Sequence, residues 1–409
     1  MRLKLSAPSN KLLKSDIAIT GSKSETNRLL LLQALFSNIA LANISNSDDA
    51  QVMAKGLKVS NGEVDIHHAG TAMRFLTSYF ASQEGKEVIL TGSGRMQERP
   101  IKVLVDALKS LGADIQYKKN EGYPPLKIKG KKFLKNTVSL PADISSQYIS
   151  SLLLIAPSLD NGIELNLVGK ITSVPYIKMT LALLEEAGIA SSFNGNKIIV
   201  QSKKSIEDTT FVVESDWSAA SYFYSIIALA DVGSEIKLSA YKENSLQGDS
   251  VLSEIYKEFG VETKFLDNHI VLNKVKNISK KTINLALENA PDIAQTIAVT
   301  CLGLGISCHL TGLHTLPIKE TDRLAAMKTE LEKLGGAVNI SEESLTLDIC
   351  ENLINGVAID TYNDHRMAMA FAPIALKTNL MINDAEVVSK SYPDFWKDIK
   401  LIGIGVNKI

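Results

Sequence analysis

One short pattern recurs four times along the chain, and this repetition restricts the folds that it can adopt. The pattern is a charged helix that ends at glycine and is followed by two short strands. The closing glycines are Gly112, Gly188, Gly260 and Gly336, which lie 72 to 76 residues apart. Glycine suits the left-handed residue after a helix, and β-branched residues resume beyond it. The repetition predicts an α/β protein built from copies of one unit.

A second kind of helix lies between these copies and is apolar on nearly every side, so we expect it to be buried. Six stretches fit this description: residues 28–36, 73–81, 148–156, 219–230, 294–304 and 366–375. At 409 residues the chain is too long for one ordinary core. We therefore expect three copies in each of two similar domains. One domain comprises residues 1–20 and 215–409, and the other comprises residues 21–214.

The charge balance argues against several classes of function. The chain has 44 basic and 45 acidic side chains, which disfavours bulk binding of nucleic acid or of an anionic membrane. Its start has no apolar stretch of signal-peptide length, so the cytoplasm is the expected location. The uncharged run 293–318 contains His309, His314 and Pro317. We interpret that run as a buried helix followed by a strand rather than as a membrane span.

The cysteines and histidines do not form a metal-binding pattern. Cys301, Cys308 and Cys350 show no CxxC spacing and no nearby histidine pair, which predicts buried thiols rather than disulfides or a zinc site. His365 has no second His or Cys at ligand spacing, so we interpret it as a hydrogen-bonded structural residue. No metal is expected.

Polar motifs crowd the starts of the apolar helices. Residues 21–28 read GSKSETNR, residues 69–74 read AGTAMR, residues 145–147 read SSQ, residues 291–292 read PD and residues 363–366 read NDHR. Helix N-termini offer unpaired N–H groups and a positive dipole end, so several of them facing a shared cleft would hold anions. The simpler interpretation is helix capping, and Ser22 with Glu25 fits a capping box.

Capping does not explain the cations that accompany these motifs. The cations are Lys23, Arg28, Arg74, Arg95, Arg99, Lys319, Arg323, Arg366 and Lys390. In a chain of almost no net charge, such clustering indicates substrates with several negative charges. Ordinary structural explanations also exist: the stems of Arg28 and Arg74 would cover apolar surface, and Arg95 and Arg99 would pair with Glu98.

Two further motifs allow other interpretations. Residues 319–323, KETDR, would also suit a charged first helical turn. Lys23-Ser24 ends like a nucleotide-binding phosphate loop, but Ser22 and Ile17 stand where that motif needs glycine. The sequence therefore carries no NTPase signature.

Eleven short motifs stand in a characteristic order between about residues 5 and 396. They are GSKSETNRLLLL, HAGTAMRFL, RMQERPI, YPPL, SSQY, SVPYI, NSLQGD, PDIAQT, KETDRL, YNDHRMAM and KSYPDF. In this order they resemble the family of 3-phosphoshikimate 1-carboxyvinyltransferases, also called EPSP synthases. The resemblance implies two domains, each of three βαβαββ units with buried helices beneath mixed sheets, an arrangement called an inside-out α/β barrel. It also implies a monomer that closes over its substrates and needs no cofactor or metal.

The resemblance implies a reaction and its residues. The enolpyruvyl group of phosphoenolpyruvate is transferred to the 5-hydroxyl of shikimate 3-phosphate by addition and elimination. Residues matching shikimate 3-phosphate contacts are Lys23, Ser24, Arg28, Ser145, Ser146, Ser173, Tyr176, Asp292 and Lys319. Residues matching phosphoenolpyruvate contacts are Lys23, Gly70, Arg99, Gln147, Arg323, Arg366 and Lys390, with Arg74 and Arg95 as support. The resemblance assigns phosphoenolpyruvate-side residues to the domain of residues 1–20 and 215–409, and shikimate 3-phosphate-side residues to the domain of residues 21–214.

The resemblance also implies catalytic roles. Asp292 would accept the hydroxyl proton, and Glu320 and Lys23 are candidates for delivering protons. A carboxylate near several cations stays ionised, and a lysine can exchange a proton where arginine cannot.

The chain departs from the family pattern at two places, and two rival functions stay open. His68 stands where many bacterial relatives have Asn, and Leu316-Pro317-Ile318 precedes Lys319 where relatives often carry an Arg. The enzymatic rival is the enolpyruvyl transferase acting on UDP-N-acetylglucosamine, which typically has Lys-Asn where this chain has Lys23-Ser24, and a loop Cys that is missing here. The other rival is a catalytically silent anion-binding module of the same fold.

Overall fold

The chain divides into two compact units. The computed structural model describes residues 1–10, 12–142, 145–171, 174–278 and 281–409. Unit 1 comprises Met1–Thr20 and Glu214–Ile409, and unit 2 comprises Gly21–Val213. Glu214, which we predicted to belong to the segment 21–214, belongs to unit 1. The reason is local, because its carboxylate accepts hydrogen bonds from Trp217 Nε1 at 2.8 Å and from Ser245 Oγ at 2.6 Å.

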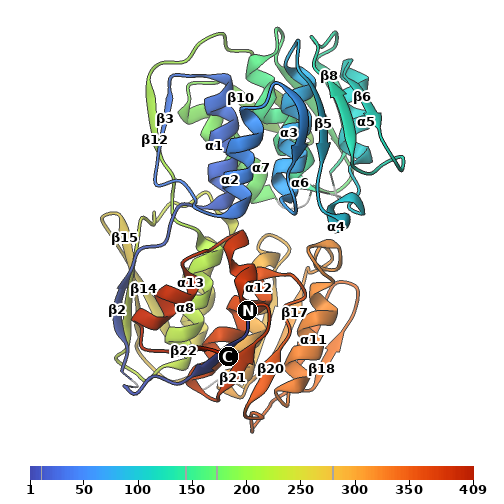
Figure 1. Cartoon of the computed structure of the whole chain (residues 1–409). Coiled ribbons are helices and arrows are strands. Elements are labelled where there is room, and N and C mark those ends of the chain that lie inside the picture. The colour runs from blue at the N-terminus through green and yellow to red at the C-terminus, as the bar shows by residue number, and fades with distance from the viewer. Residues whose placement is uncertain (11, 143–144, 172–173, 279–280) are drawn as a thin grey trace. The chain divides into compact units, whose positions relative to one another are not determined.

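Unit 2 alternates helices with short strands (Figure 1). Its helices are α1 (Lys23–Leu35), α2 (Asp48–Leu57), α3 (Gly70–Ser82), α4 (Gly94–Gln97), α5 (Lys102–Leu111), α6 (Ser146–Ile155) and α7 (Val174–Glu186). Its strands are β3 (Ile39–Ala42), β4 (Asn61–Asp65), β5 (Glu87–Thr91), β6 (Asp114–Tyr117), β7 (Leu126–Lys129), β8 (Thr137–Pro141), β9 (Ile163–Val168), β10 (Ser191–Asn194), β11 (Lys197–Val200) and β12 (Thr209–Val212).

Unit 1 repeats this alternation and contains both chain ends (Figure 1). Its helices are α8 (Trp217–Leu229), α9 (Leu252–Ile255), α10 (Ala294–Leu304), α11 (Arg323–Lys333), α12 (His365–Phe371) and α13 (Phe395–Leu401). Short 3₁₀ segments include η2 (Gly248–Val251), η3 (Tyr256–Phe259), η4 (Pro291–Ile293) and η6 (Ala372–Leu376). Its strands are β1 (Leu3–Ser6), β2 (Lys14–Ile17), β13 (Glu235–Ser239), β14 (Val261–Leu266), β15 (His269–Lys274), β16 (Thr282–Ala286), β17 (Ser307–Thr311), β18 (Val338–Ile340), β19 (Leu345–Leu347), β20 (Val357–Ile359), β21 (Leu380–Ile382) and β22 (Gly405–Lys408).

One sheet pattern recurs in both units. A parallel pair is extended by two antiparallel neighbours, as in β4-β5-β7-β6 and β8-β9-β11-β10 of unit 2. Unit 1 has the same pattern in β2-β13-β15-β14 and β16-β17-β19-β18. Its third sheet, β20-β21-β1-β22, takes one antiparallel strand from each chain end, and Leu5 pairs with both Leu380 and Val406. The third sheet of unit 2 is the parallel pair β12-β3. The predicted three-fold α/β arrangement is confirmed.

The six apolar stretches form the buried helices of the two units. In unit 2, α1, α3 and α6 pack against one another, and in unit 1, α10 packs against α8, α12 and η6. Small polar residues join these helices inside the core: Ser78 Oγ lies 3.0 Å from Ser151 Oγ, and Thr300 Oγ1 lies 2.8 Å from Ser225 Oγ. Because sheets cover these helices, their apolar residues can face inward on every side. Each unit has its own hydrophobic core.

The structure changes two details of the predicted repeats. Gly112, Gly188 and Gly260 have positive φ after their helices, but in the fourth copy Gly335, with φ 102°, takes that conformation rather than Gly336. A side chain at Gly336 would lie 3.0 Å from Leu347 Cδ1, so that position is reserved for close packing. The third charged helix is split into η2, α9 and η3, which an apolar pattern alone does not distinguish from one α-helix.

The uncharged run contains the buried helix α10 and the strand β17, as predicted. In the described ranges, no helix is both long and apolar enough to cross a membrane.

Candidate active site

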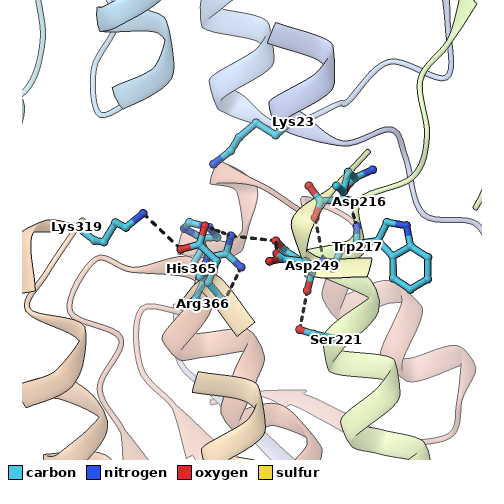
Figure 2. Close-up of polar contacts among 12 residues, drawn as sticks. Lys23, Asp216, Trp217, Ser221, Asp249, Lys319, His365 and Arg366 are labelled. Atoms are coloured by element: carbon cyan, nitrogen blue, oxygen red, sulfur yellow. Dashed lines mark hydrogen bonds and ion pairs between the residues drawn. The ribbon is translucent and has the colours of Figure 1, made fainter. Parts of the chain in front are cut away.

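A carboxylate surrounded by cations lies at the centre of the polar cluster in unit 1. Asp292 Oδ1 accepts a hydrogen bond from Arg323 Nη1 at 2.8 Å and lies 3.6 Å from Lys319 Nζ. Asp292 Oδ2 lies 3.1 Å from Arg366 Nη2. Figure 2 shows the Lys319 side chain extending toward the cluster that contains Arg366. The structure therefore brings together four residues that were predicted from their motifs.

Two more carboxylates extend this cluster. Arg323 Nε donates to Asp364 Oδ2 at 2.6 Å, and Arg323 Nη2 donates to Glu320 Oε2 at 2.8 Å. Glu320 Oε1 also accepts from Lys390 Nζ at 2.9 Å. Arg323 is buried and holds three carboxylates at once, so the cluster is preorganised by one side chain.

The local field favours the charged forms of Asp292, Arg323 and Arg366. Burial alone would raise the pKa of Asp292, but Arg366, Lys319 and Arg323 outweigh burial and hold that pKa well below its usual range. Burial likewise would lower the pKa of Arg323 and of Arg366, but the neighbouring carboxylates raise both. Asp292, Arg323 and Arg366 are thus ionised, and both arginines already pair with carboxylates.

Three helix starts meet at Arg366. Asp364 caps α12 by accepting from the Arg366 N–H at 2.9 Å. The Arg366 guanidinium then contacts Asp292 just before α10, and it donates from Nη2 to Ser218 Oγ at 3.2 Å in the first turn of α8. The repeated helix packing places these starts together, although 148 residues separate Arg366 from Ser218.

A further acidic residue lies behind Ser218. The Ser218 hydroxyl donates to Asp249 Oδ2, and the second oxygen of Asp249 is buried without a hydrogen-bond partner among the described residues. Burial and the nearby charge of Asp292 raise the pKa of Asp249 to about 6. Asp249 therefore titrates much closer to neutral pH than Asp292 does.

In unit 2, Lys23 begins α1 and contacts an acidic partner on α2. Its Nζ lies 3.4 Å from Asp49 Oδ2, and Asp49 Oδ1 lies 4.0 Å from His68 Nε2. Ser22 precedes α1 without making a side-chain cap, so the capping box that the sequence allowed with Glu25 is not formed. Ser24 is half-buried in the first turn.

Arg28 is buried one turn further along α1 and is held by neutral oxygens. Its Nε donates to Thr180 Oγ1 at 2.8 Å, Nη1 to the Ser24 carbonyl at 2.8 Å, and Nη2 to Ser150 Oγ at 3.1 Å and the Tyr176 carbonyl at 3.3 Å. Burial lowers the pKa of Arg28 to about 10. A buried guanidinium that neutral oxygens hold in place is suited to attract an anion.

Gly70 begins α3 and lies against two arginines. A side chain there would lie 2.7 Å from Arg99 Nη1 and 3.2 Å from Arg74 Nη1. Arg74 is buried and donates to the Gly70 carbonyl at 3.0 Å and to the Pro100 carbonyl at 3.3 Å, which suits a supporting role. Arg95 is exposed and pairs with Glu98, so the surface interpretation holds for that residue.

The start of α6 places the remaining residues of unit 2. Ser145 caps α6 by accepting from the Gln147 N–H at 3.3 Å, and Gln147 Nε2 donates to Thr71 Oγ1 at 3.3 Å. The starts of α6 and α3 are therefore in contact. Ser146, the first residue of α6, is buried. Ser173 lies outside the described residues.

Within the described part of the chain, no group of three or more His, Cys, Asp or Glu side chains is arranged to hold a metal ion. His365 is buried, and its Nδ1 lies 3.6 Å from Asp364 Oδ1. The three cysteines are buried and free.

Comparison with known proteins identifies the family. A family model described as EPSP synthase (3-phosphoshikimate 1-carboxyvinyltransferase) matches residues 57–399. The chain belongs to the EPSP synthase family. It is 44% identical over 414 residues to a protein of Bacteroides fragilis strain YCH46 named 3-phosphoshikimate 1-carboxyvinyltransferase, covering 99% of both chains. A protein of Vibrio campbellii with the same name is 36% identical over 425 residues, covering 97% of this chain and 98% of its own.

The fold agrees with that of a solved member of the EPSP synthase family. The structure of EPSP synthase from Acinetobacter baumannii superposes with a TM-score of 0.80 at 21% identity, covering 100% of both chains. The family resemblance drawn from the eleven motifs is confirmed.

Four residues in the polar clusters of the two units were not predicted from the sequence. They are Asp49, Ser218, Asp249 and Asp364, which contact Lys23, Arg366, Ser218 and Arg323 respectively. Asp364 and Asp249 stand inside quoted motifs, YNDHRMAM and NSLQGD, so their positions were a usable signal. Ser218 carried none, since a serine in a helical first turn is common.

Proposed function

We propose that this chain transfers the enolpyruvyl group of phosphoenolpyruvate to the 5-hydroxyl of shikimate 3-phosphate. The products are 5-enolpyruvylshikimate 3-phosphate and inorganic phosphate. The observation that carries the proposal is the Asp292 carboxylate held by Arg323, Arg366 and Lys319 in a member of the EPSP synthase family. Such a centre offers a base, and it offers cations that can bind the two anionic groups of phosphoenolpyruvate, its carboxylate and its phosphate.

The two substrates are assigned to residues by their motifs. The donor set comprises Lys23, Gly70, Arg99, Gln147, Arg323, Arg366 and Lys390. The acceptor set comprises Lys23, Ser24, Arg28, Ser145, Ser146, Ser173, Tyr176, Asp292 and Lys319. The ion pairs of Arg323, Arg366 and Lys390 support the first assignment, because each guanidinium or ammonium already binds a carboxylate that a substrate anion can replace.

Donor binding would change the basicity of Asp292. Without ligand, three cations outweigh burial and depress its pKa, so Asp292 is a weak base. When the carboxylate and phosphate of the donor engage Arg323 and Arg366, the depression weakens and the pKa of Asp292 rises. The base would therefore become effective only when phosphoenolpyruvate is present.

The proposed chemistry balances without a cofactor. The methylene carbon of phosphoenolpyruvate takes a proton from Glu320 or Lys23, and C2 becomes cationic in character. The 5-hydroxyl oxygen then bonds to C2 while Asp292 accepts the hydroxyl proton. In the second half, the bond between C2 and the phosphate oxygen breaks and a methyl proton returns to Glu320 or Lys23, which restores the double bond. The hydroxyl proton held by Asp292 passes to the departing phosphate. Fixed cations compensate the charge that the departing phosphate carries.

Phosphate release tests the proposed acceptor. The protein is incubated with phosphoenolpyruvate and either shikimate 3-phosphate or UDP-N-acetylglucosamine, and phosphate and products are quantified. We expect phosphate release when shikimate 3-phosphate is the acceptor and no release when UDP-N-acetylglucosamine is the acceptor. Release only with the sugar nucleotide would assign the rival transferase activity, and no release with either acceptor would favour a silent binding module.

The setting of the reaction is also part of the proposal. By resemblance to the family, the chain would act as a cytoplasmic monomer without a cofactor. Light scattering on the purified chain, with and without substrates, measures its mass directly, and a stable dimer would contradict the monomer.

A further inference from the structure

The loop that precedes α12 contains two adjacent residues in an unfavourable backbone conformation. It connects β20 to α12 and includes Tyr362, with φ 53°, and Asn363, with φ 56°. The left-handed region is tolerated by Asn but is rare for a bulky residue such as Tyr. Conformations of this kind persist where surrounding contacts enforce them, and they cluster at functional sites.

Helix α11 holds this loop at two points. Arg323 and Glu330 are seven residues apart, which places them on the same face of α11 about two turns from each other. Arg323 Nε donates to Asp364 Oδ2 at 2.6 Å, beyond the left-handed pair. Glu330 holds the other side of the pair, because its Oε2 accepts from the Asp360 N–H at 3.2 Å.

Glu330 also fixes the tyrosine itself. The carboxylate is completely buried, and its Oε1 accepts from the Tyr362 hydroxyl at 2.6 Å and from Lys333 Nζ at 2.8 Å. Lys333 in turn donates to Asp360 Oδ2 at 2.7 Å. The loop therefore has few ways to relax without breaking a charge-assisted bond.

The loop affects the position of Arg366 through one residue, Asp364. Asp364 follows the left-handed pair directly and caps α12 through the Arg366 N–H at 2.9 Å. Arg366 then contacts Asp292 at 3.1 Å. The loop conformation thus sets where α12 begins and where the Arg366 guanidinium lies.

We propose that Glu330 and Tyr362 form a positioning clamp for Arg366. This inference rests on the proposed function, in which Arg366 binds the phosphoenolpyruvate anion. Neither clamp residue is among those assigned to a substrate, so both act through Asp364 and α12. The clamp keeps Arg366 aligned before the donor arrives, which lowers the cost of binding and aligns the transition state.

The first test removes only the hydroxyl of the clamp. Tyr362 is about a third exposed, so Tyr362→Phe leaves the core of unit 1 unchanged. We expect phosphoenolpyruvate to bind about tenfold more weakly and kcat to fall, since small misplacements of positioning groups are costly. The KM for shikimate 3-phosphate should stay near the wild-type value. Titration calorimetry with phosphoenolpyruvate, steady-state kinetics and thermal unfolding provide the readouts.

The matched control is Tyr117→Phe in unit 2. The Tyr117 hydroxyl is buried without a hydrogen-bond partner among the described residues, so its loss should leave both affinity and rate unchanged. Wild-type affinity and kcat in Tyr362→Phe would overturn the clamp. The clamp would also be overturned if the loss of phosphoenolpyruvate affinity in Tyr362→Phe is explained by a lower midpoint of thermal unfolding, because that result indicates a structural role alone.

A double-mutant cycle tests the specific bond. If the clamp acts through the contact between Glu330 and Tyr362, the losses of phosphoenolpyruvate affinity in Glu330→Gln and Tyr362→Phe should be non-additive. The double variant should bind phosphoenolpyruvate no more weakly than the weaker-binding single variant. Fully additive losses would contradict the clamp. If Glu330→Gln does not fold, Tyr362→Phe alone decides. A wild-type chain that binds phosphoenolpyruvate without turnover would contradict the proposed function, while the affinities would still test the clamp.

Discussion

The carboxylate of Asp292 balances three cations in unit 1, and of these Arg323 is almost completely buried. In the proposed mechanism, the same arrangement that keeps Asp292 charged makes it a weak base until an anionic substrate engages the cations. This coupling between charge and basicity is decided by individual atoms and is best tested one side chain at a time.

Replacing Asp292 with Asn preserves shape and removes the charge. We expect Asp292→Asn to lower kcat by about 10²-fold or more, because the amide cannot accept the hydroxyl proton. Steady-state phosphate release measures the change. The control is Asp231→Asn, which alters an exposed carboxylate after α8. Equal kcat values for Asp292→Asn and the control would remove Asp292 from the mechanism.

A substitution at Gly70 tests the proposed phosphoenolpyruvate contacts of unit 2. In Gly70→Ala the new methyl group meets the end of the Arg99 side chain at 2.7 Å, which can move, so we expect the fold to be retained. The displaced guanidinium should raise the KM for phosphoenolpyruvate about tenfold and leave the KM for shikimate 3-phosphate nearly unchanged.

Gly94→Ala is the matched control for this substitution, because a side chain at Gly94 has no neighbour within 4 Å. Measuring both Michaelis constants for the two variants separates crowding at Arg99 from a general effect of added methyl groups. If Gly70→Ala keeps the wild-type KM for the donor, Arg99 does not contact phosphoenolpyruvate.

Among the elements, strand β15 ends in a lysine that caps two helices. Lys274 is buried, and its Nζ donates to the Ala228 carbonyl at 2.7 Å and to the Phe259 carbonyl at 2.8 Å. Both carbonyls lie at helix C-terminal ends, where the dipole favours a cation. Burial nevertheless lowers the pKa of Lys274 to about 8, and the charge of Lys377 contributes to the lowering.

This lowered pKa predicts a stability change with pH. Between pH 8 and about 10.5 the unfolded chain binds the Lys274 proton more strongly than the folded chain does, so the free energy of unfolding should rise with pH in this window. The rise has an upper bound of about 3 kcal/mol. It should be missing in Lys274→Met. Urea unfolding of unit 1 across this pH range measures it.

Lys264→Met, on the neighbouring strand β14, is the control for Lys274→Met. Lys264 is exposed, so its removal should leave the pH dependence of the wild type in place. Identical pH slopes for Lys274→Met and the wild type would show that Lys274 does not titrate in this range.

At the scale of the whole molecule, two separate cores imply two cooperative blocks. The core of unit 2 includes Leu153, and the core of unit 1 includes Leu302; both side chains are buried. Because each unit buries its own apolar surface, unfolding of the chain need not be two-state.

Calorimetry with one core substitution in each unit tests this independence. Leu153→Ala and Leu302→Ala should each cost about 2 to 5 kcal/mol. We expect each to lower one calorimetric transition and to leave the other near its wild-type temperature. A single transition that shifts equally in both variants would show that the two units unfold as one block.

Much of the architecture was predictable because its signals are local. A helix that is apolar on all sides must be buried, and a glycine after a charged helix closes it, so the repeats could be read from short windows. Prediction failed where two local choices were equivalent. Either Gly335 or Gly336 could have closed α11, and packing against Leu347 decided between them.

The candidate site was predictable only as a set of residues. The motifs indicated which arginines and lysines would hold anions, but they did not pair Arg323 with Asp364 or connect Asp249 to Arg366 through Ser218. Such pairings depend on which helix starts meet, and 74 residues separate Asp292 from Arg366.

The sequence by itself determined the repeated α/β units and the family, because periodicity, caps and ordered motifs are properties of the chain alone. Only the tertiary structure decided which charges balance one another, since Coulomb interactions depend on distance and burial rather than on order along the chain. The left-handed backbone at Tyr362 belongs to the same category. No local preference favours it, and contacts from α11 hold it.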